Sequence, residues 1–174
     1  MTSRRLSYAG LMIAAGLTGV YAENIPNFEV LTLVVFASGV LLGRRDGALI
    51  GALTMLVFSV LNPYGVAHPL VTASQVAGES VAGWVGGMSA GLAALPAAFR
   101  AAWLGVLGAG ITAGFDLLTN LATGVVLGQM RAVLIGGVPF ALWHMGTNVA
   151  LFAVVGTPVV AVLSRYRSRL SPSG

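Results

Sequence analysis

Apolar residues run along the chain in six long blocks, and each break between blocks is rich in glycine, proline, asparagine or charge. The blocks cover roughly residues 6–21, 29–42, 48–61, 70–95, 101–127 and 133–163. A helix that crosses a bilayer needs about 20 mostly apolar residues, so we predict an all-α membrane protein with a bundle of six transmembrane helices. No linker, fixed-period repeat or low-complexity segment separates the blocks, so residues 1–174 are interpreted as a single membrane domain.

The composition agrees with this pattern. Hydrophobic residues make up 57% of the chain and charged residues 8%, whereas a soluble domain carries about 25% charged residues. The chain therefore has too little polar surface to cover a soluble fold. It contains no cysteine, which excludes disulfides, thiolate metal sites and thiol nucleophiles.

The positions of the basic residues predict the orientation. The chain has nine arginines and no lysine, and six spans with a cytoplasmic N-terminus leave only Arg131 outside. The eight arginines on the inside are Arg4, Arg5, Arg44, Arg45, Arg100, Arg165, Arg167 and Arg169. This bias follows the positive-inside rule. We therefore expect both termini in the cytoplasm of a bacterial-type cell, with the chain in its plasma membrane, and no nucleic-acid partner.

The first block has two interpretations. Two early arginines, a short apolar stretch and small residues within 20–22 resemble a cleavable secretory signal. As a retained helix, the block carries Gly10, Ala14 and Thr18 at a spacing of four, and such a small-residue stripe allows another helix to approach closely. The stripe serves either a partner or packing within the bundle.

Three successive blocks carry pairs of polar residues four positions apart, which places each pair on one helix face. The pairs are Gln75 and Glu79, Asp116 and Asn120, and His144 and Asn148. An ionisable group near the bilayer centre costs at least about 2.5 kcal/mol unless it faces protein or water. Helical rise places Glu79, Asp116 and His144 in one layer, about 13–17 Å below the outer boundary. These residues predict either a polar cavity that opens outward or interhelical hydrogen bonds alone.

Enzymatic alternatives have less support. Residues 87–91 match G-x-S-x-G and, with His144, resemble the dyad of rhomboid intramembrane proteases. Ser89, however, lies roughly 10–15 Å from the layer of His144 by helical rise, and a base must approach within about 3.2 Å of the proton it takes. No metal-binding spacing is present. We therefore expect no enzyme, no catalytic residue and no metal site.

A family resemblance lies in the first 65 residues. Residues 25–35 begin with Ile25-Pro26-Asn27-Phe28-Glu29, and glycines follow at Gly39, Gly43, Gly47 and Gly51. This stretch resembles the S components of energy-coupling factor (ECF) transporters, in which a Pro-Asn segment opens the second helix and a Leu-Leu-Gly turn joins it to the third. The rest of the chain is similar in size and expected architecture.

The resemblance implies a subunit that captures a vitamin or related micronutrient. The resemblance also implies three partners, a transmembrane T component and two cytoplasmic ATPases, and no cofactor bound by this chain itself. The chain has no Walker motif, so we expect ATP hydrolysis to come from a partner. Family docking uses small residues of the first helix, here Gly10 and Ala14. The family's substrate site maps onto Asn27, Glu29, Gln75, Glu79, Asp116, Asn120 and His144. The acidic residues favour a ligand with amine, amide or cationic groups, and a corrin held through the histidine is one option. The alternative, from a different functional class, is that the chain is a structural or assembly membrane protein.

Overall fold

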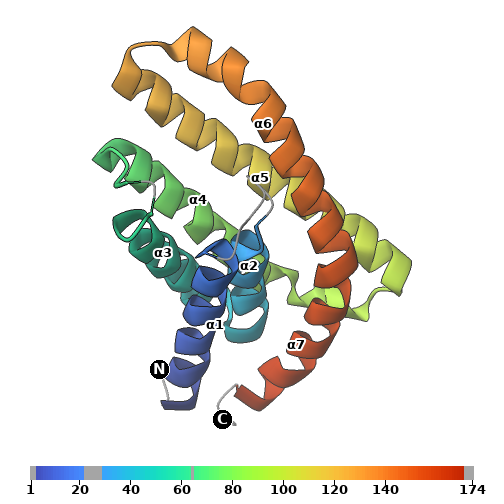
Figure 1. The fold of residues 1–174 in the computed structure, drawn as a ribbon. Coiled ribbons are helices and arrows are strands. Elements are labelled where there is room, and N and C mark those ends of the chain that lie inside the picture. The colour runs from blue at the N-terminus through green and yellow to red at the C-terminus, as the bar shows by residue number, and fades with distance from the viewer. Residues whose placement is uncertain (1–2, 22–28, 64, 171–174) are drawn as a thin grey trace.

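A computed structural model describes residues 3–21, 29–63 and 65–170, and this part of the chain is all-helical (Figure 1). The helices are α1 (Ser3–Tyr21), α2 (Leu31–Leu42), α3 (Arg44–Val60), α4 (Pro69–Met88), α5 (Ala97–Leu127), α6 (Met130–Leu151) and α7 (Thr157–Leu170). A 3-10 segment, η1 (Ser89–Ala94), follows α4, and a π-helical segment, η2 (Phe152–Gly156), joins α6 to α7. The predicted all-α class is confirmed for the described residues.

Two helical stretches are long and apolar enough to cross a membrane, judged by length and composition. One is α5, with 31 residues, and the other is the continuous run Met130–Arg167, with 38 residues. By contrast, α2 is apolar but only 12 residues long, so it extends about 18 Å along its axis. This length falls short of the ~30 Å hydrocarbon core of a bilayer.

The short helix α2 lies at the centre of the molecule. It packs against α1, α3, α4 and α7, and every residue except Val34 is buried (Figure 1). A helix that is apolar on all sides belongs in such an interior position. Near its middle, Phe36 meets Phe152 edge-on, with ring centroids 5.1 Å apart. This contact ties the core helix to the π-helical segment.

Glycines allow α2, α3 and α4 to approach one another at backbone distance. A Cβ atom added to Gly39 or Gly47 would overlap the carbonyl oxygen of Gly83, and one added to Gly86 would overlap that of Phe36. No side chain fits between such backbones, and only glycine avoids the overlap. We call this contact of the three helices the glycine junction, and it gives the glycines at positions 39 and 47 a physical role.

The turn between α2 and α3 is tighter than the sequence pattern suggested. Residues 43–47 were expected to form a break, but only Gly43 lies outside the helices. Its φ of +94° is a conformation that side-chain-bearing residues rarely adopt, so one glycine reverses the chain direction. The third helix therefore begins at Arg44 rather than at residue 48.

The last three helical regions also differ from their predicted ranges. The α-helical part of the fourth block ends at Met88, and the fifth helix already begins at Ala97. The sixth block is helical from Met130, but the run widens into η2 before Pro158. Proline cannot donate a backbone hydrogen bond and its ring collides with the preceding turn, so a widened turn accommodates it.

An antiparallel hairpin of α5 and α6 forms the other main part of the molecule (Figure 1). The turn is made by Gly128, which adopts the left-handed conformation with φ +64° and closes α5 in the manner of a C-terminal glycine cap. The facing residues follow from two observed contacts. Asp116 meets His144, and a Cβ on Gly108 would lie 2.9 Å from the ring of Phe152. Residues two turns apart on α5 therefore contact residues two turns apart on the α6–η2 run, in the opposite chain direction.

Candidate functional site

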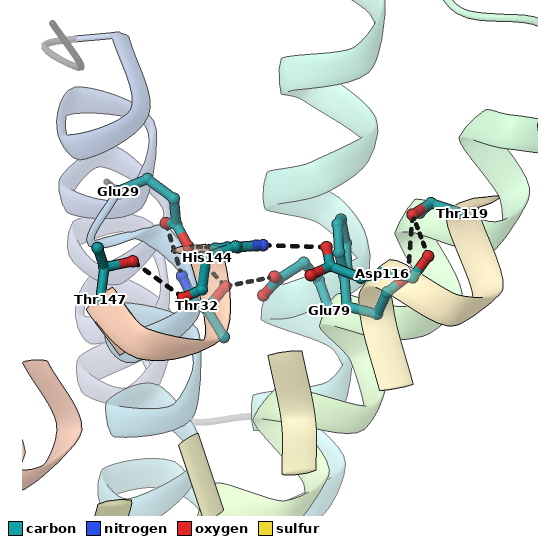
Figure 2. Close-up of polar contacts among 8 residues, drawn as sticks. Glu29, Thr32, Glu79, Asp116, Thr119, His144 and Thr147 are labelled. Carbon is teal, nitrogen blue, oxygen red and sulfur yellow. Dashed lines mark hydrogen bonds and ion pairs between the residues drawn. The ribbon is translucent and has the colours of Figure 1, made fainter. Parts of the chain in front are cut away.

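A histidine of α6 lies between a carboxylate of α5 and one from the segment just before α2 (Figure 2). His144 Nδ1 lies 3.0 Å from Asp116 Oδ1, and its Nε2 lies 3.6 Å from Glu29 Oε1. Because a carboxylate only accepts hydrogen bonds, the first contact places a proton on Nδ1. His144 is 8% exposed. The ring is therefore held through Nδ1, while Nε2 faces Glu29 without a hydrogen-bond partner among the described residues.

A threonine joins two further carboxyl groups to this arrangement. Thr32 Oγ1 lies 2.8 Å from Glu29 Oε1 and 2.8 Å from Glu79 Oε1, and its backbone N–H donates to Glu29 Oε2 at 3.1 Å. A hydroxyl carries one proton and donates to one acceptor at a time. Both side-chain contacts are hydrogen bonds when one of the two glutamates is protonated. Glu79 is only 2% exposed, so this carboxyl group is held deep inside the protein.

These side chains line a small cavity of about 150 Å³, which we call the acidic cavity. Its polar wall contains Glu29, Thr32, Gln75, Glu79 and His144, and its apolar wall contains Val20, Leu31, Met55, Phe58 and Phe115. A few convergent polar groups in a mainly apolar pocket are typical of small-molecule sites. The acidic residues give the cavity a negative character, which favours a ligand with positive charge or hydrogen-bond donors.

A second cavity of about 370 Å³, the hairpin cavity, lies between α5 and α6. It is lined by Phe115, Asp116, Thr119, Asn120, Gly137, Phe140, Ala141 and His144. His144 and Phe115 line both cavities, with the two rings edge-to-face and their centroids 6.3 Å apart. The two cavities are therefore neighbours that share these two rings as part of their lining.

Several buried polar atoms around the site have no hydrogen-bond partner among the described residues. They are Glu79 Oε2, Asp116 Oδ2, His144 Nε2, Thr112 Oγ1 and both side-chain polar atoms of Asn148. The register of the hairpin places Thr112 and Asn148 at the same level as each other. Both lie one helical turn farther from the turn at Gly128 than the pair of Asp116 and His144. Buried polar groups are normally satisfied. This concentration of unsatisfied atoms indicates a place where water or a ligand completes the hydrogen bonding.

The structure brings four of the predicted site residues into one group: Glu29, Glu79, Asp116 and His144. Gln75 lines the same acidic cavity and accepts from Ser59 Oγ at 3.4 Å. Asn120 lines the hairpin cavity, where its amide lies against Gly137. Asn148 lies one turn below this group and is 1% exposed. Asn27 lies outside the described residues.

The two residues predicted to dock a partner, Gly10 and Ala14, are both exposed on α1. A Cβ added to Gly10 would meet nothing within 4 Å. Thr18, the third member of the stripe, is exposed as well and donates to the carbonyl of Ala14 at 2.8 Å. This face of α1 is therefore uncovered in the isolated chain.

Sequence reasoning missed Thr32, Thr112 and Phe115. Thr32 follows Glu29 by three positions, and this spacing in an otherwise apolar block was the available signal. Thr112 precedes Asp116 by one helical turn and so extends the polar face that was already recognised on the fifth block. Phe115 gave no signal, because an apolar ring in an apolar helix is expected to pack anywhere.

The G-x-S-x-G segment lies at the junction of α4 and η1. Ser89 donates its hydroxyl proton to the carbonyl of Val85 at 2.8 Å, while His144 is engaged with carboxylates. Within the described ranges, no group of three or more His, Cys, Asp and Glu side chains is placed to hold a metal ion.

Comparison of the sequence with models of known protein families and with curated proteins gives no match in either case.

Proposed function

We propose that the chain is the substrate-binding S component of an ECF-type transporter, which captures a vitamin-like micronutrient from outside the cell. In this proposal six helices span the plasma membrane and both termini are cytoplasmic. A T component and two ATPases supply the energy. The observation that carries the proposal is the acidic cavity, in which Glu79 and His144 are buried together and polar atoms lack partners.

Two features of the helices support the membrane arrangement. The stretches Ala97–Leu127 and Met130–Arg167 have the length and composition of membrane spans. The start of α1 also lies beside the end of α7, since Arg5 Nη1 donates to the carbonyl of Leu170 at 3.4 Å. An even number of spans brings both ends of a chain to the same side. Arginines at this end agree with a cytoplasmic location.

The polar groups support a ligand class. Three carboxyl groups and one imidazole line the two cavities, so acceptors and negative charges predominate. A ligand with an amine, amidine or other cationic group would satisfy Glu79 Oε2 and Asp116 Oδ2, which have no partner among the described residues. Phe58 and Phe115 add aromatic surface for a ring or alkyl portion.

The test is thermal unfolding of the detergent-purified chain against a panel of vitamins and their precursors. Ligand at about 100 times its Kd stabilises a protein by about 2.7 kcal/mol. We expect one compound to raise the unfolding temperature, and Glu79→Gln and Asp116→Asn to abolish that shift. Glu79→Gln suits this purpose because its amide can donate to Thr32 Oγ1 and preserve the local contact.

The matched control is Asp46→Asn, which removes a partly buried carboxylate at the other end of the molecule, where it pairs with Arg5. This variant should keep the ligand-dependent shift. If no compound stabilises the protein, while Glu79→Gln and Asp116→Asn lower its stability, the polar groups act as interhelical contacts. The chain would then be a structural or assembly membrane protein.

A further inference from the structure

A pocket of about 300 Å³ lies at the end of the molecule opposite the turn of the α5–α6 hairpin. It is formed where α1 begins, α2 gives way to α3, and α7 ends. Its charged lining consists of Arg5, Arg44, Arg45, Asp46 and Arg167. Four positive charges and one negative charge leave a formal net charge of +3. We call this the arginine pocket.

Two of its guanidinium groups are fixed by the protein itself. Arg5 Nη2 donates to Asp46 Oδ2 at 2.6 Å and also to the carbonyl at the end of α2. Arg167 Nη1 donates to the carbonyls of Val40 and Gly87, at 3.3 Å and 3.1 Å. Both side chains are thus held at the C-terminal ends of α2 and α4. Two of the four positive charges are therefore held in place by contacts within the protein.

The other two guanidinium groups are available for a ligand. Arg44 and Arg45 are exposed, and neither makes a hydrogen bond or ion pair with the part of the chain that the structure describes. Each guanidinium group offers five N–H donors in a planar fork that matches the oxygens of a phosphate group. The first backbone N–H groups of α3 lie at the same place, beside the carbonyl ends of α2 and α7 that Arg5 contacts.

We propose that the arginine pocket binds the phosphate group of an anionic lipid headgroup. This inference rests on the proposed function to the extent that the chain spans a membrane, since only then does this end lie at the level of the cytoplasmic headgroups. Basic pockets between helices on that side of a membrane bind anionic headgroups. The proposal is independent of which micronutrient occupies the acidic cavity.

The test uses the purified full-length chain in a neutral detergent. Phosphatidylglycerol, phosphatidylcholine or inorganic phosphate is titrated while the unfolding temperature is recorded. We expect phosphatidylglycerol to stabilise the protein more than phosphatidylcholine does. The double variant Arg44→Gln/Arg45→Gln should weaken the apparent affinity for phosphatidylglycerol about 30-fold, from the usual contribution of two arginines near an anionic surface. Both residues are exposed, so the variant should fold normally.

The control variant is Arg131→Gln, an exposed arginine at the start of α6 and outside the pocket, and it should leave the titration unchanged. Stabilisation by inorganic phosphate that depends on Arg44 and Arg45 would support the phosphate site and identify its source as free phosphate. Equal stabilisation by the two lipids, or an unchanged titration in the double variant, overturns the proposal. A chain that stays soluble without detergent would contradict the membrane arrangement itself, before any lipid is added.

Discussion

The helices contact one another in opposite ways at the glycine junction and at the α5–α6 interface. At the junction, α2, α3 and α4 touch through their backbones because glycines remove the side chains. Between α5 and α6, polar side chains face each other, and several of their buried atoms have no partner among the described residues. The first contact therefore fixes the relative positions of three helices, and under the proposed function a ligand would complete the second.

The largest effect is expected from filling the glycine junction. Gly83→Val would drive a side chain into the backbone of α3, where a Cβ alone overlaps the carbonyl of Gly47. Such overpacking costs about 3 kcal/mol or more. The matched control is Gly110→Val on α5, where an added Cβ meets nothing within 4 Å. Thermal or denaturant unfolding of both variants gives the difference. Equal stability of the two would show that the helices of the junction are free to separate.

A smaller effect is expected for the contact between His144 and Asp116. In a double-mutant cycle of Asp116→Ala and His144→Ala, we expect a coupling free energy of about 2 kcal/mol, because the 3.0 Å hydrogen bond is charge-assisted and partly buried. The pair Ser59 and Gln75, at 3.4 Å, serves as the comparison and should couple by less than about 0.5 kcal/mol. A coupling free energy below about 0.5 kcal/mol between His144 and Asp116 would show that their contact does not organise the site.

The smallest effect is expected at Thr112, and it has the opposite sign. Thr112→Val keeps the side-chain shape and removes a hydroxyl that is 1% exposed and has no partner among the described residues. The ligand-free protein should become more stable by about 1 kcal/mol. In Thr54→Val the lost hydroxyl donates to the carbonyl of Ile50 at 2.7 Å, so no gain is expected. A loss of stability in Thr112→Val would mean that bound water already satisfies this group.

The acidic residues of the site could be found from the sequence because an ionisable group in an apolar helix is costly. Helical rise then placed Glu79, Asp116 and His144 at one depth, and two of them are in direct contact in the structure. The bridging role of Thr32 could not be found in this way. A threonine within a helix usually bonds to its own backbone, and only the packing of α2 against α4 brings Glu79 within reach.

The sequence predicted where the helices lie along the chain more accurately than it predicted their first and last residues. Apolar blocks locate a helix, but its end depends on one or two residues and on what they pack against. At Gly43 a single positive φ replaces the five-residue break that the pattern suggested. The arginine pocket was equally hidden, because it combines residues from both ends of the chain with the corner between α2 and α3.

The shortness of α2 has a consequence for movement of charge. Its first turn meets Glu29, and its last carbonyls meet Arg5 and Arg167. The acidic and basic groups therefore stand at opposite ends of one 12-residue helix. Under the proposed function, about 18 Å of protein, the length of α2, separates the acidic cavity from the arginines at the cytoplasmic end. A cationic cargo released from Glu79 would already have passed the outer part of the ~30 Å hydrocarbon core, and only the inner part would remain to be crossed.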